Sequence, residues 1–123
     1  MSKWREERGA VAVEFAFVVP VLLLILFGIM EFGRAYNTQI SLTHAARETA
    51  RHMAVTGDWG NAIAFGRDAA PSLTAANMSF AADPAACAPG TSVNVTITYP
   101  MDTLTGVVGD WNLTGKAAMR CGG

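Results

Sequence analysis

The apolar residues of this chain are concentrated in one block near the N-terminus. Residues 10–30 read AVAVEFAFVVPVLLLILFGIM and contain a single charged residue, Glu14. At 1.5 Å per residue, a helix of this length spans about 30 Å, which is the thickness of the hydrocarbon core of a bilayer. The block is too long for an ordinary signal-peptide core, and no small-x-small cleavage site follows it. The pattern therefore predicts a transmembrane helix.

A helical pattern continues beyond the apolar block. Five residues follow one another at spacings of seven, four, three and four, which is typical of one face of a helix. They are Ala35, Leu42, Ala46, Thr49 and Met53. Gly57 is a suitable residue to end this helix. We therefore expect one helix from about residue 10 to about residue 55, with its first half in lipid and its second half forming a stem against a small domain.

The remainder of the chain has the pattern of a small α+β domain. Asp58 is a candidate N-cap for a short helix from about Trp59 to Ala70, which Pro71 would end. The segment Ser92–Tyr99, SVNVTITY, alternates apolar with polar residues and predicts a strand with one buried face.

Two further segments have weaker strand character. A short strand is expected at Met78–Phe80 and another at Trp111–Arg120, with a turn-prone connection at residues 102–110. Two or three antiparallel strands packed on a helix give an α+β fold. The predicted organisation is a leader at residues 1–9, a transmembrane helix and stem at 10–56, and a small extracytoplasmic domain at 57–123.

Charge gives the orientation of the predicted span and excludes some partners. The leader carries Lys3, Arg5 and Arg8, and a basic flank stays in the cytoplasm, so the C-terminal domain is expected outside, with membrane lipid as a partner. Only 15% of the residues are charged and the net charge is -1. Scattered basic residues give no reason to expect nucleic acid. With no nucleophile elbow or glycine-rich phosphate loop in the sequence, we predict neither an enzyme nor a cofactor nor a small-molecule substrate.

The two cysteines, Cys87 and Cys121, favour a disulfide over a metal site. They form no CxxC pair, and His44 and His52 lie far upstream. The disulfide would close a loop of about 35 residues and contribute about 3–4 kcal/mol of stability. Two reduced thiols that merely pack are the alternative, which a cytoplasmic location would favour. No metal site is predicted.

Glu14 is the unusual residue of the apolar block. A carboxylate one turn inside a membrane helix is costly and is by default a functional candidate, although it could also snorkel to the headgroups. Cleavage after Gly9 would make Ala10 the new N-terminus and Glu14 the fifth residue of the mature chain. A free amine and a carboxylate at that spacing can neutralise each other within one helix or between staggered helices, which is important where an unpaired charge is costly.

These residues also carry a family resemblance. The run GAVAVEF from Gly9 to Phe15 matches the G/xxxxEF processing motif of Flp-type prepilins. The longer stretch from Arg8 to Tyr36 resembles the start of TadE-like proteins of the tight-adherence (Tad) pilus system, and the resemblance extends to roughly Arg51.

The resemblance implies a specific processing and assembly pathway. A prepilin peptidase would cut between Gly9 and Ala10, and Glu14, next to Phe15 in the motif, would guide assembly with other pilins and Tad components. The chain is longer than the major Flp pilins, which points to a minor pilin or pseudopilin in the bacterial inner membrane. The alternative is a single-pass, membrane-anchored binding or sensor module that is never processed.

Overall fold

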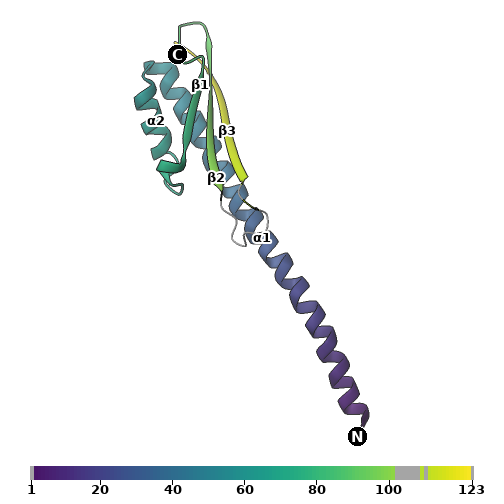
Figure 1. The fold of residues 1–123 in the computed structure, drawn as a ribbon. Helices are drawn as coiled ribbons and strands as arrows, with labels where there is room; N and C mark the ends of the chain where they lie inside the picture. The colour runs from purple at the N-terminus through teal and green to yellow at the C-terminus, as the bar shows by residue number, and fades with distance from the viewer. Residues whose placement is uncertain (1, 102–108, 110, 123) are drawn as a thin grey trace. The chain divides into compact units, whose positions relative to one another are not determined.

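The computed structural model of this 123-residue chain describes residues 2–101, 109 and 111–122. It confirms the α+β class, with two α-helices, a short 3-10 helix and a three-stranded sheet (Figure 1). In chain order the elements are α1 (Ser2–Thr56), α2 (Trp59–Asp68), η1 (Ala75–Asn77), β1 (Ser79–Asp83), β2 (Ser92–Met101) and β3 (Trp111–Arg120). Of the predicted connection at 102–110, all but Gly109 lies outside the described residues. The chain divides into two compact units, residues 1–33 and 34–123, and α1 contributes to both.

Helix α1 ends where the sequence predicts but begins earlier. Gly57 adopts a left-handed φ of 69°, and its N–H donates to the carbonyl of Met53 at 2.9 Å, which terminates the helix. The predicted start at residue 10 is wrong, because α1 begins at Ser2 and includes the leader. The Lys, Glu and Arg residues of the leader are good helix formers, and Gly9 costs only about 1 kcal/mol relative to Ala.

The predicted buried face of α1 is confirmed in the second unit. All five residues of that face are buried, and three alanines on the same helix, Ala45, Ala50 and Ala54, are buried with them. These short side chains let the sheet and α2 lie close to the helix axis. This face of α1 therefore supplies a large share of the buried residues of the second unit.

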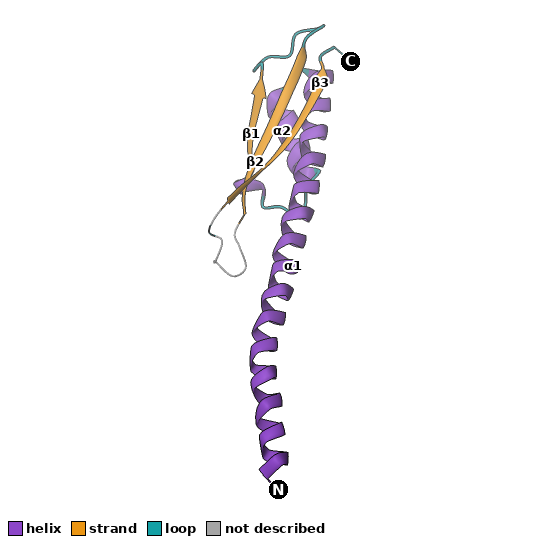
Figure 2. Ribbon diagram, turned by 90° about the vertical axis from the view of Figure 1, so that its right-hand side faces the viewer, coloured by secondary structure: helices purple, strands orange, loops and turns teal. Residues whose placement is uncertain are grey.

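The sheet covers this core from one side, as Figure 2 shows. Its strands are antiparallel in the order β1-β2-β3, and Phe80, Ile97 and Gly115 lie opposite one another in register. Val93, Val95 and Ile97 of β2 are buried while Asn94 is exposed, so the predicted alternation is confirmed. The predicted strand at 111–120 has the bounds of β3.

Two glycines permit close approach to α1. A Cβ atom on Gly115 of β3 would lie 2.5 Å from the carbonyl oxygen of Leu42, and one on Gly66 of α2 would collide with Oγ1 of Thr49. Gln39 adds a hydrogen bond between α1 and β3, because its Nε2 donates to the carbonyl of Thr114 at 2.7 Å. The spacing of the layers in this unit therefore depends on residues without side chains.

Helix α2 begins with the predicted cap. The Oδ1 atom of Asp58 accepts a hydrogen bond from the backbone N–H of Asn61 at 3.2 Å. The helix ends at Asp68, two residues before the predicted Ala70.

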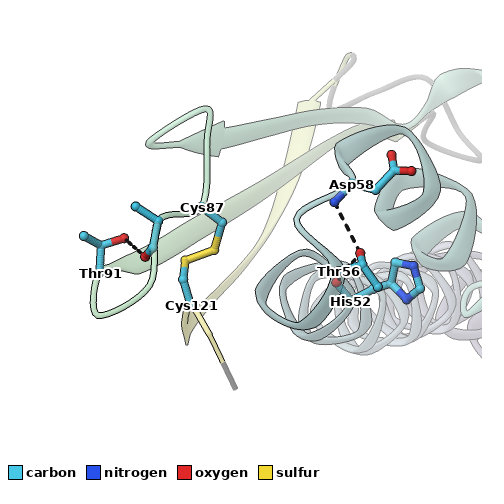
Figure 3. The surroundings of a disulfide bond; sticks show 7 residues. His52, Thr56, Asp58, Cys87, Thr91 and Cys121 are labelled. Carbon is cyan, nitrogen blue, oxygen red and sulfur yellow. Dashed lines mark hydrogen bonds between the residues drawn. A yellow bond between two sulfur atoms is a disulfide. The ribbon is translucent and has the colours of Figure 1, made fainter.

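A disulfide fastens the end of β3 (Figure 3). Cys87 and Cys121 are bonded, with their Cα atoms 5.6 Å apart. The N–H of Cys121 donates to the carbonyl of Thr91 at 2.7 Å, and that of Gly122 donates to the carbonyl of Ala54 at 3.0 Å. The loop before β2, the end of β3 and the end of α1 are thus joined at one place.

Candidate functional site

The first unit presents an apolar surface that no other part of the unit covers. The side chains of residues 10–30 are exposed apart from the half-buried Val19, and Phe15, Phe17 and Leu24 expose 68%, 73% and 72% of their surface. A continuous apolar surface of this kind marks a region of contact with lipid or protein. Among the described residues, α1 is the one helix long and apolar enough to cross a membrane.

The predicted cleavage position lies within α1, in the first unit. The Gly9–Ala10 bond belongs to the helix, and both residues are exposed. A Cβ atom added to Gly9 would meet nothing within 4 Å, and the φ angle of Gly9 is not positive. Folding of this unit therefore does not require glycine at position 9. A requirement imposed from outside, such as a narrow protease subsite, would explain a residue with no side chain there.

Glu14 lies one turn beyond that bond. On a helix, residues i and i+4 are neighbours with Cβ atoms about 5–6 Å apart, so Ala10 and Glu14 share one side of α1. Glu14 is exposed and forms no ion pair within the described part of the chain. Phe15 is the next residue and points its apolar surface outward. A new amine at Ala10 would thus be within reach of the Glu14 carboxylate.

The histidines and cysteines singled out from the sequence lie in the second unit and do not form a common cluster. His44 is exposed, whereas His52 stacks on Phe65 of α2 with ring centroids 4.1 Å apart. The two cysteines are joined to each other at the end of β3. Within the described ranges no group of three or more His, Cys, Asp or Glu residues could hold a metal ion.

A polar pocket in the second unit was not predicted. It has a volume of about 310 Å³ and is lined from α1, from the segment between α2 and β1, and from the end of β2. Its lining includes Arg34, Asn37, Asn77 and Tyr99. These residues are far apart in the sequence and have no common spacing, so only the fold shows that they share a pocket.

The comparison with protein families agrees with the sequence motif. Residues 9–51 match the model of the family described as TadE-like protein. No curated protein and no solved structure matches the chain. The matched range begins at Gly9 and contains the whole apolar block, Glu14 and most of the buried face of α1. This family consists of structural components of the pilus rather than enzymes. The match confirms the resemblance and identifies residues 9–51 as a segment similar to the TadE-like family.

Proposed function

We propose that this protein is a minor pilin or pseudopilin of a Tad/Flp-type pilus that serves surface adherence. The chain is inserted in the inner membrane with its leader in the cytoplasm. A prepilin peptidase cuts it after Gly9, and its apolar helix then enters the pilus or the base of the pilus. The observation that carries this proposal is the exposed apolar helix with a carboxylate, Glu14, one turn beyond a glycine that packing does not require.

Cleavage would help assembly by supplying a positive charge that can pair with the Glu14 carboxylate. In lipid an unpaired carboxylate is costly, and the chain offers Glu14 no basic residue between positions 10 and 30. Cleavage would create an ammonium group at Ala10 near that carboxylate. Pairing with the amine of the same chain or of a neighbouring chain would lower the cost and fix the relative position of adjacent helices.

The second candidate is a membrane-anchored binding or sensor module that keeps its leader. The polar pocket of the second unit is the observation that favours it. In that case the helix would be a permanent anchor, and Glu14 would only reach the headgroup region.

Processing separates the two candidates. Coexpression of the chain with a prepilin peptidase should give a mature protein that begins at Ala10, as read from the intact mass and N-terminal sequencing. The variant Gly9→Leu should remain uncut, because a large side chain would block a subsite built for glycine. Gly28→Leu is the matched control, since a Cβ atom there also meets nothing within 4 Å. An intact leader on the wild-type chain, or normal cleavage of Gly9→Leu, would refute the processing step.

A further inference from the structure

The polar pocket lies at the end of the second unit where α1 enters it. Arg34, the first residue of this unit, and Asn37 line the pocket from α1. Arg34 follows Met30, the last residue of the apolar block, by four positions, which is about 6 Å along a helix. In a membrane-inserted chain the pocket would therefore lie at the level of the lipid headgroups.

The chemistry of the pocket suits a phosphate group. Seven of its described lining residues have polar side chains, and these are Arg34, Asn37, Thr38, Ser72, Thr74, Asn77 and Tyr99. Guanidinium, hydroxyl and amide groups donate hydrogen bonds to phosphate oxygens. None of the described lining residues is acidic. A guanidinium has five N–H donors, so it can serve a phosphate alongside a protein partner.

One wall of the pocket is held in place by a contact between two segments. The hydroxyl of Tyr99, on β2, accepts a hydrogen bond from the backbone N–H of Thr74 at 3.3 Å. Tyr99 is half-buried and packs against the core, so the segment around Thr74 is fixed relative to the sheet. This contact therefore fixes the positions of Thr74 and Tyr99 in the pocket wall relative to each other.

Aromatic residues near the same end of the unit give an independent indication of lipid. Trp111 pairs with Met101, which lines the pocket, and it exposes 45% of its surface. Tyr36, two residues beyond Arg34, exposes 62%. Tryptophan and tyrosine are enriched at membrane–water interfaces, where the ring meets apolar chains and the polar tip meets headgroups.

We propose that this pocket binds the phosphate of a membrane phospholipid and, together with Trp111, seats the second unit on the bilayer surface. The proposal rests on the membrane insertion put forward above but not on cleavage after Gly9. It names a ligand class for the second unit, and it applies whether the chain is a pilin or a permanent anchor.

The first test uses tryptophan fluorescence of the full chain in vesicles that contain a phospholipid spin-labelled on its headgroup. One variant carries Trp4→Phe and Trp59→Phe, so that Trp111 is its single tryptophan. The matched control carries Trp4→Phe and Trp111→Phe, so that Trp59 is its single tryptophan. Trp59 follows the end of α1, which lies about 33 Å along the helix from Arg34. We expect Trp111 to be quenched several-fold more strongly than Trp59. Equal quenching of the two would overturn the proposal.

The second test measures lipid binding by native mass spectrometry of the full chain in detergent, titrated with phosphatidylglycerol. Arg34→Gln should weaken binding roughly tenfold, the effect expected for loss of charged hydrogen bonds. Arg47→Gln, an exposed arginine on the same helix that does not line the pocket, should leave it unchanged. Equal binding by wild type and Arg34→Gln would contradict the proposal.

Two further outcomes identify what has failed. Inorganic phosphate that binds as strongly as the lipid would assign the pocket to a soluble phosphate compound and overturn the lipid proposal. Flotation of the vesicles supplies the control for insertion, because a chain that does not float with them overturns both the membrane placement and the pocket proposal. Flotation with unquenched Trp111 overturns the pocket proposal alone.

Discussion

At the scale of single residues, the close contact between Gly66 and Thr49 sets two effects against each other. Alanine is a better helix former than glycine by about 1 kcal/mol, whereas overpacking a core typically costs about 1–3 kcal/mol. A Cβ atom at position 66 would collide with the Thr49 hydroxyl and lie 2.9 Å from a ring carbon of Phe80. The clash should outweigh the gain in helix propensity.

We therefore expect Gly66→Ala to lower the free energy of unfolding by about 1–2 kcal/mol. Gly60→Ala, on the same helix, should leave it unchanged or raise it, because its Cβ would meet only Asp58 at 3.5 Å. In a Thr49→Ala background the penalty at position 66 should shrink, which is the signature of a direct contact. Thermal unfolding of the full chain in detergent, followed by near-ultraviolet circular dichroism, measures all of these variants. An unchanged penalty in the Thr49→Ala background would contradict the contact.

Glu14 leads to a different kind of prediction, because its effect should be on assembly and not on folding. Glu14→Ala removes an exposed carboxylate from the apolar helix, so membrane insertion should be kept or improved. Incorporation into the pilus should be lost, as measured by the protein content of sheared filaments. Glu7→Ala removes a carboxylate from the part of the chain that processing would discard, so piliation should stay normal. Normal piliation of Glu14→Ala would show that the carboxylate does not guide assembly.

At the scale of elements, periodicity predicted most of what the structure contains. The five residues spaced along the stem and the alternating residues of β2 are buried because the helix and the strand each offer one apolar face. The start of α1 was predicted too late because the charged residues before Gly9 were assigned to a separate leader, although they also favour a helix. Gly66, Gly115 and the stack of His52 on Phe65 could not be predicted, since they depend on which surfaces meet.

The proposed processing motif, in contrast, depends only on local sequence. Gly9 and Glu14 are close in the sequence and lie on one helix, so their spacing alone places them. The pocket around Arg34 depends on three separated segments and needs the fold. The candidate site near the N-terminus could therefore be named from the sequence, and its processing stays a prediction, whereas the pocket could not be named without the fold.

The disulfide is the element-scale feature with the largest expected effect on stability. It closes a loop with a sequence separation of 34 residues. Replacing both cysteines, Cys87→Ser with Cys121→Ser, should lower the free energy of unfolding of the second unit by about 3–4 kcal/mol. Urea unfolding in detergent measures the change, and chemical reduction of the wild type should give a similar loss. A loss below about 1 kcal/mol, well short of the usual effect of removing a native disulfide, would mean that packing alone holds β3 in place.

At the scale of the whole molecule, the proposed membrane orientation can be tested by thiol labelling. In intact cells whose outer membrane has been made permeable, a maleimide that cannot cross the inner membrane should label Asn94→Cys, which is exposed on β2. In cells that lack the prepilin peptidase, so that residues 1–9 stay attached, it should not label Ser2→Cys until the inner membrane is disrupted. The native cysteines give little background because they are bonded to each other. The reverse labelling pattern would contradict an outward second unit.

If the chain is cleaved as proposed, the continuity of α1 through Gly9 and Ala10 would affect the rate of cleavage. Proteases commonly bind their substrates in an extended form, so the helix must fray from Ser2 past Ala10 before the bond can be cut. The population of that frayed state, and with it the rate of cleavage, would then depend on the helix propensity of the leader. A leader with a proline at position 7 should mature faster than the wild type, and one rich in alanine should mature more slowly. The helix propensity of the leader would thus set the delay between membrane insertion of a chain and its entry into a filament.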